Sequence, residues 1–238
     1  MNKNIIELKN VAKHYFIGDN IVRALDGVDI SVEEGDFVAI MGPSGSGKST
    51  SMNLTGSLDL STKGEIYLDG ENIKNLDESE LAQVRGKKIG FIFQQFNLIP
   101  NLTVQENVML PMLFQNINEE YRKKKSKELL KLVELDDRID HYPNQISGGE
   151  QQRVAIARAL ANNPDVILAD EPTGNLDTKT GKKVMEFLDK LNKKRKTIIM
   201  ITHDPDLAKE YAKIIYFLKD GVIEKIERKI SEKWRKVK

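Results

Sequence analysis

The chain has 238 residues, enough for one large domain or two small ones with a buried core. Its 37 basic and 36 acidic residues nearly cancel, so no global field draws it to nucleic acid or anionic lipid. The absence of cysteine excludes disulfides, thiolate nucleophiles and cysteine-ligated zinc. No stretch approaches the ~20 apolar residues of a membrane span.

The first segment has the pattern of antiparallel strands joined by tight turns. We expect strands at residues 5–11, 21–32 and 65–68, with turns at Gly18-Asp19 and Asp69-Gly70. Short apolar runs follow at residues 37–41, 89–93, 166–169 and 197–202, separated by helical patterns. Such runs are typical of buried parallel strands, so the fold class is α/β, with ligands expected at the carboxyl ends of the strands.

A helical, highly charged stretch begins at Thr103 and ends near His141. We expect a helical subdomain at 96–163, a core made of 1–95 and 164–228, and a basic tail at 229–238. In the tail, Ile226, Ile230 and Trp234 recur every four residues among lysines and arginines. This spacing predicts a terminal helix, either folded back on the domain or lying on a membrane surface.

The strongest chemical signal is a glycine-rich loop directly after the apolar run 37–41. It fits G-x-x-x-x-G-K-[ST] at every position, which is the pattern of a phosphate-binding loop that opens a helix. Its backbone N–H groups and lysine would hold the phosphates of a nucleotide, and Ser49 would ligate Mg²⁺. The loop consists of Gly42, Pro43, Ser44, Gly45, Ser46, Gly47, Lys48, Ser49 and Thr50.

Polar side chains follow three of the other apolar runs. Asp170 and Glu171 end one run, where Asp170 could hold Mg²⁺ and Glu171 could accept a proton from an attacking water. His203 and Gln94 follow two more runs, and Gln94 could also contact Mg²⁺. The paired carboxylates predict hydrolysis of the nucleotide rather than binding alone.

A second phosphate-binding helix start is predicted at Ile146 to Arg153, ISGGEQQR. Ser147 is a good N-cap, Gly148 and Gly149 allow close approach of a ligand to the backbone, and an apolar helical pattern continues to Leu160. Two anion sites in one chain of this size require an explanation that the residues by themselves do not supply.

In order and spacing, GPSGSGKST, FIFQQF, ISGGEQQR, VILADEP, GNLD at 174–177 and His203 resemble the nucleotide-binding subunit of ABC transporters. The resemblance covers essentially the whole chain. It implies a P-loop NTPase core, a parallel sheet flanked by helices, with an antiparallel β subdomain and an inserted α-helical subdomain. It further implies ATP and Mg²⁺ as ligands, and a homodimer in which each phosphate loop is capped by the other subunit's ISGGEQQR helix.

By this resemblance, the contacts to ATP in trans come from Ser147, Gly148, Gly149 and Glu150, and Tyr15 stacks on adenine. The dimer interface contains Asn175, Leu176 and Asp177. Two places depart from the family pattern. Ile146 and Glu150 stand where leucine and glutamine are usual, and Gly174-Asn175 stands where serine-alanine is usual. A carboxylate at position 150 would be repelled by phosphate unless it bonds elsewhere.

The runs FQQFNLIPNLTVQENVMLP and SLDLSTKGEI resemble the subfamily that serves macrolide-efflux, lipoprotein-release and cell-division permeases. This implies a cytoplasmic subunit, peripheral at the inner face of the membrane, docked on a separate permease. An alternative is a soluble ABC-type ATPase acting on DNA or ribosomes, which the single cassette and lack of sustained heptads disfavour. We expect no nucleic-acid partner. A small-molecule P-loop kinase would instead need an acceptor site.

Overall fold

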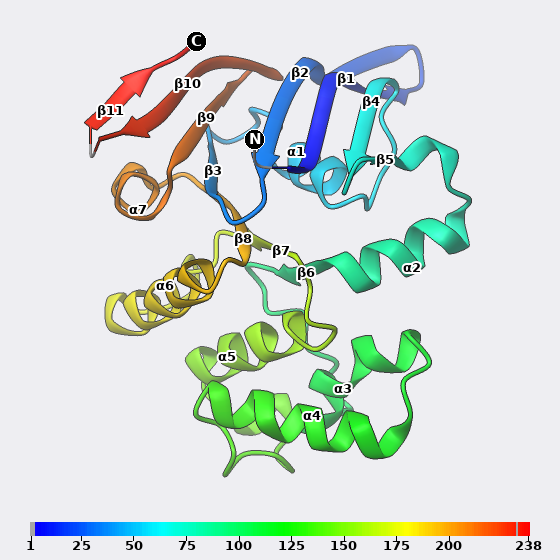
Figure 1. The fold of residues 1–238 in the computed structure, drawn as a ribbon, viewed down its shortest axis with the longest axis vertical. Coiled ribbons are helices and arrows are strands. Elements are labelled where there is room, and N and C mark those ends of the chain that lie inside the picture. The colour runs from blue at the N-terminus through cyan, green and yellow to red at the C-terminus, as the bar shows by residue number, and fades with distance from the viewer. Residues whose placement is uncertain (1–2, 232) are drawn as a thin grey trace. The chain divides into compact units, whose positions relative to one another are not determined.

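The computed structural model describes residues 3–231 and 233–238. The chain divides into two compact units, one formed by Met1–Leu81 with Asn192–Lys238 and the other by Ala82–Leu191. Figure 1 labels the elements of each unit. The second unit is larger than the helical subdomain expected at 96–163, since it also contains strands β6 and β7 and most of helix α6.

The first unit contains a four-stranded antiparallel sheet in the order β2-β1-β4-β5. Its strands are β1 (Asn4–Ile17), β2 (Asn20–Glu33), β4 (Lys63–Leu68) and β5 (Glu71–Asn72). The predicted turns are confirmed. At the second of them, Asp69 and Gly70 have φ of 55° and 87°, the positive pair that a two-residue hairpin turn requires.

A second sheet in this unit runs in the order β11-β10-β9-β3-β8. Its strands are β3 (Phe37–Met41), β8 (Thr197–Thr202), β9 (Ile214–Lys219), β10 (Val222–Ile230) and β11 (Lys233–Lys236). β3 is parallel to both β8 and β9, and every residue of β3 and β8 is buried. The near-continuous apolar runs therefore predicted buried parallel strands correctly. The unit also contains α1 (Lys48–Thr55), η1 (Ile73–Asn75) and α7 (Pro205–Tyr211).

The prediction of a C-terminal helix is wrong, because the tail forms the β10–β11 hairpin. Ile226 pairs with Tyr216 of β9, and Lys229 pairs with Trp234 of β11. A spacing of four residues is also an even spacing, so it fits one face of a strand as well as one face of a helix. Ser231, with φ of 48°, then reverses the chain and separates Ile230 from Trp234.

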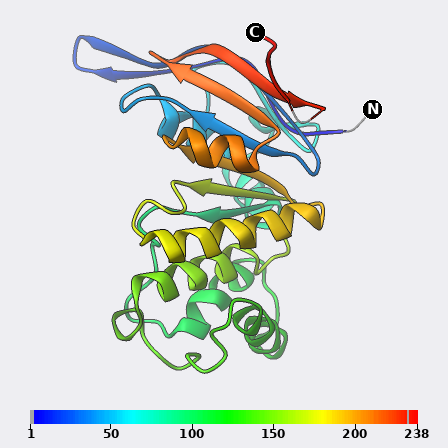
Figure 2. The same cartoon turned by 90° about the vertical axis from the view of Figure 1, so that its left-hand side faces the viewer.

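In the second unit, β6 (Ile89–Ile92) and β7 (Val166–Asp170) form a parallel pair. The remaining elements are α3 (Val104–Phe114), α4 (Glu119–Leu132), η2 (Pro143–Gln145), α5 (Gly148–Ala159) and most of α2 (Glu78–Lys88), which leads into β6, and of α6 (Thr178–Lys193). The predicted helical stretch after Thr103 is thus confirmed as α3 and α4. Figure 2 shows α6 running beside α5. Across the described ranges 3–231 and 233–238, no helix has the length and apolar character to cross a bilayer.

Helix α5 begins at the predicted N-cap with a reciprocal capping box. The Ser147 hydroxyl accepts a hydrogen bond from the Glu150 N–H at 3.3 Å, and the Glu150 carboxylate accepts from the Ser147 N–H and hydroxyl, each at 2.7 Å. Arg138 Nε lies 3.6 Å from the same carboxylate. These hydrogen bonds from Ser147 hold the pKa of Glu150 below its usual range.

We predict that Glu150→Ala lowers the free energy of unfolding by about 1 kcal/mol, because it removes one half of the capping box. Chemical denaturation measures the loss. A carboxyl group whose pKa is lower in the folded state stabilises the folded protein at pH values above its unfolded-state pKa. This stabilisation is lost as the pH falls through the folded-state pKa. The difference between wild type and Glu150→Gln should therefore shrink from neutral pH toward pH ~3. An equal difference at both pH values would contradict this account.

Candidate functional site

The loop after β3 is held by close backbone approach to two neighbouring strands. A Cβ atom at Gly42 would lie 2.1 Å from the carbonyl oxygen of Leu218 in β9. A Cβ atom at Gly47, where φ is 99°, would lie 2.4 Å from the carbonyl oxygen of Ala24 in β2. Only glycine fits these two positions, so the predicted loop pattern follows from packing as well as from ligand access.

The mouth of this loop has the chemistry of an anion site. Helix α1 begins at Gly47 with no side-chain cap and no acidic residue in its first turn, so its first N–H groups are not covered by a side chain. The Lys48 ammonium donates to the carbonyl oxygens of Gly42 at 2.8 Å and Pro43 at 2.7 Å, which lie across the loop. The buried Ser46 hydroxyl has no hydrogen-bond partner among the residues that the structure describes. These donors fit a phosphate group, whose oxygens would be their acceptors.

His203 leaves the sheet beside this loop. Met41 of β3 pairs with Thr202 of β8 in parallel register, so Gly42 and His203 follow adjacent strands at the same edge. Directly after His203, Asp204 caps α7 by accepting from the N–H groups of Asp206 and Leu207. The first unit thus brings the phosphate loop and His203 together.

The side chain of Tyr15 is held by Asp59 and Lys13, not by the phosphate loop or His203. Its hydroxyl donates to Asp59 at 3.4 Å, and the Lys13 ammonium lies 5.2 Å from its ring centroid. The residue is 36 % exposed, so part of the ring remains available for stacking.

A second group of predicted residues meets at the edge of the β6–β7 pair. Ile92 pairs with Ala169, so Gln94, Asp170 and Glu171 all follow at the same strand ends. Glu171 has φ of 41°, and its carbonyl oxygen accepts the Gly174 N–H at 2.9 Å. This turn brings Gly174 back toward the two predicted catalytic side chains.

Gly174 packs tightly against both of them. A Cβ atom there would lie 3.1 Å from the Gln94 side-chain nitrogen and 3.4 Å from a carboxylate oxygen of Glu171. The next residue, Asn175, donates from its side chain to the Gln94 carbonyl oxygen at 2.7 Å. The Gly174-Asn175 departure from the family pattern thus has a local use, because the glycine leaves room and the asparagine fixes the backbone of Gln94.

Helix α5 supports this edge through two residues that sequence reasoning missed. The Gln152 side chain, 1 % exposed, donates to the Pro172 carbonyl oxygen at 2.8 Å. Arg158 donates to the carbonyl oxygens of Phe96, at 2.7 Å, and Asn97. Burial lowers the pKa of Arg158. Gln152 could have been found as a polar residue four positions before the buried Ile156, on the same face of the helix.

The start of α5 and the GNLD segment are held within the second unit. A Cβ atom at Gly149 would lie 2.6 Å from the Thr180 methyl group, while Gly148 faces the ring of Phe96. Asp177 accepts the Thr180 N–H at 3.0 Å, and hydrogen bonds from Thr180 lower the pKa of its carboxyl group. The Leu176 N–H bonds to the Thr173 carbonyl oxygen. The Glu150 carboxylate accepts its hydrogen bonds from Ser147 of the same capping box.

The expected Mg²⁺ ligands come from both units, with Ser49 in the first and Gln94 and Asp170 in the second. Within the described part of the chain, no group of three or more histidine, cysteine, aspartate or glutamate side chains could hold a metal ion. A hydroxyl, an amide and one carboxylate offer oxygen atoms, the ligands that Mg²⁺ takes in proteins.

Comparisons with known proteins show the family of this chain. Residues 25–174 match the sequence profile of the ABC transporter family. An uncharacterized ABC transporter ATP-binding protein of Methanocaldococcus jannaschii, MJ0796, is 55 % identical over 94 % of this chain and 97 % of its own length. A macrolide export ATP-binding/permease protein, MacB, of Bdellovibrio bacteriovorus is 48 % identical over 94 % of this chain but only 34 % of its own.

Among solved structures, the dimeric post-hydrolysis state of the cassette MJ0796 bound to ADP and Pi superposes with a TM-score of 0.87 at 52 % identity. The alignment covers 94 % of this chain and 98 % of that one. The resemblance inferred from the motifs is confirmed, as is the expected α/β fold. The chain belongs to the ATP-binding cassette family of ABC transporters.

Proposed function

We propose that this protein binds and hydrolyses ATP as the nucleotide-binding subunit of an ABC transporter. The observation that carries the proposal is the phosphate loop, where the uncapped start of α1, Lys48 and the unpartnered Ser46 hydroxyl offer donors to phosphate oxygens. The β- and γ-phosphates of ATP would lie against these groups, with Lys48 exchanging its two carbonyl partners for phosphate oxygens. Tyr15 would stack on the adenine.

Hydrolysis is assigned to the residues at the edge of β6 and β7. Glu171 would accept a proton from the water that attacks the γ-phosphorus, or orient that water, and His203 would contact the γ-phosphate. Ser49, Gln94 and Asp170 would hold Mg²⁺, which supplies positive charge to the phosphates. The hydrogen bonds of Gly174 and Asn175 support this assignment, since they fix the backbone of Glu171 and Gln94.

We further propose that the active form is a homodimer in which the start of α5 from one copy caps ATP on the phosphate loop of the other. Ser147 and the backbone of Gly148 and Gly149 would make the contacts. Glu150 would act through its cap on Ser147, because its carboxylate already accepts two hydrogen bonds there. Asn175, Leu176 and Asp177 would lie at the interface. The dimeric MJ0796 structures support the proposed homodimer.

The partner we propose is an integral-membrane permease on another polypeptide, which would place this subunit at the inner face of the membrane. The MacB relatives combine an ATP-binding part with a permease part in one chain, and this chain matches about a third of them. A permease helix would dock beside Gln94, so that closure and opening of the ATPase dimer would move the permease.

The catalytic role of Glu171 is tested by Glu171→Gln. We expect ATP binding to persist and phosphate release to fall by about 10²-fold or more, because the amide cannot accept the proton from water. ATP should then trap a dimer visible by size exclusion. Lys48→Ala serves as the control that loses nucleotide binding. A Glu171→Gln protein that stays monomeric and still hydrolyses ATP would refute the scheme.

The positioning role of Gln152 is tested by Gln152→Ala. Loss of the bond to Pro172 should lower kcat about tenfold while leaving the affinity for a fluorescent ATP analogue nearly unchanged. Gln151→Ala is the neighbouring control, since that side chain bonds to Pro143 and Ile146 instead. Denaturation curves separate a change in kcat from partial unfolding. An unchanged kcat in folded Gln152→Ala would show that the bond has no part in catalysis.

A further inference from the structure

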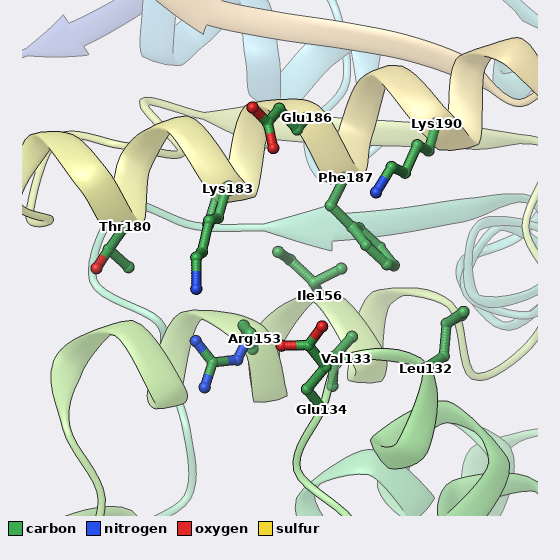
Figure 3. Close-up of a pocket in the computed structure, with 11 residues that line it drawn as sticks. Leu132, Val133, Glu134, Arg153, Ile156, Thr180, Lys183, Glu186, Phe187 and Lys190 are labelled. Carbon is green, nitrogen blue, oxygen red and sulfur yellow. The ribbon is translucent and has the colours of Figure 1, made fainter.

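A pocket of about 210 Å³ lies in the second unit, and none of the residues assigned to ATP lines it. Its walls are α5, α6 and the segment that ends α4, as the close-up in Figure 3 shows. A cavity of about 150 Å³ accommodates benzene, so this pocket has room for one substituted ring. None of its lining residues belongs to the phosphate loop, the hydrolysis edge or the first turn of α5.

The pocket is apolar at its base and polar at its rim. Val133, Ile156 and Val184 are each at most 3 % exposed, and the half-buried ring of Phe187 points into the space between the helices. An apolar group of a ligand that packs against these side chains would be removed from water, which favours binding.

The rim carries three cations and two carboxylates: Arg153, Lys183, Lys190, Glu134 and Glu186. Although charges of both signs surround one small pocket, none of these five side chains makes a hydrogen bond or ion pair with any residue in the described ranges of the chain. Internal ion pairs therefore do not close the pocket, and its rim has a net positive charge of one.

The innermost of these charged groups is a hydrogen-bond donor. Arg153 is only partly exposed, and its Nε atom is buried without an acceptor among the described residues. A buried donor without an acceptor costs free energy, which a ligand oxygen atom would recover once the Arg153 side chain turned to meet it. Figure 3 shows Lys183 pointing toward Arg153 from α6, so two cations face one end of the pocket while Phe187 lies toward the other.

We propose that this pocket binds a small organic anion, a carboxylate carrying a single aromatic or branched apolar group. The carboxylate would accept from Arg153 and Lys183, and the apolar group would lie against Phe187, Ile156 and Val184. Glu134, which also lies near Arg153 in Figure 3, disfavours dianions at this end. The proposal does not depend on ATP hydrolysis, because binding alone tests it.

The probe is 4-fluorophenylacetate, followed by ¹⁹F NMR line broadening during titration with the full chain. We expect saturable binding of the probe, weaker by about tenfold in both Lys183→Gln and Arg153→Gln. Lys182→Gln, an exposed neighbour on the same helix that does not line the pocket, should bind like wild type. The neutral 4-fluorophenylacetamide should bind at least about tenfold more weakly than the acid.

A second arm separates binding in this pocket from binding at the phosphate loop. Lys48→Ala should retain the probe if the pocket binds it. Binding that is lost in Lys48→Ala and kept in Lys183→Gln would place the anion at the phosphate loop and overturn the proposal. Non-saturable binding, equal affinity for the amide, or equal weakening by Lys182→Gln and Lys183→Gln would also overturn it.

Discussion

The phosphate loop depends on a steric constraint: its backbone passes so close to β2 and β9 that no side chain fits at two of its positions. Gly42 lies against the Leu218 carbonyl and Gly47 against the Ala24 carbonyl. This contact presents the start of α1 at the end of β3, next to His203 on the adjacent strand. Because α1 has no cap of its own, its N–H groups need an outside acceptor. A nucleotide phosphate would meet that need.

Helix α5, in contrast, is capped at its start by side chains of its own. Its capping box uses Ser147 and Glu150, and three further hydrogen bonds reach out from the body of the helix, from Gln152 to Pro172 and from Arg158 to Phe96 and Asn97. These carbonyls belong to the loops that follow Glu171 and Gln94. If the start of α5 caps ATP bound to a second copy, the same helix also supports the hydrolysis residues of its own chain. Each copy would then serve two ATP sites through one rigid element.

Sequence alone predicted the parts of this molecule that local patterns determine. The apolar runs became buried strands, Ser147 became the N-cap of α5, and the glycine loop opened α1. The C-terminal tail was mispredicted because its even spacing suits either a helix or a strand, and only pairing with β9 decides between them. The supporting roles of Gln152 and Gly174 depend on contacts with Pro172 and Gln94, each far away in the sequence, so no local pattern identifies these partners.

The central claim is that two copies of the chain build each ATP site, and the absence of native cysteine makes it directly testable. Two differently tagged copies, both with Glu171→Gln, would carry Ser44→Cys in one and Ser147→Cys in the other. Mixing them with ATP under mild oxidation should give a disulfide between the copies, identified by peptide mass spectrometry. The yield should fall sharply without ATP. No disulfide between these positions, or the same yield without ATP, would contradict the account.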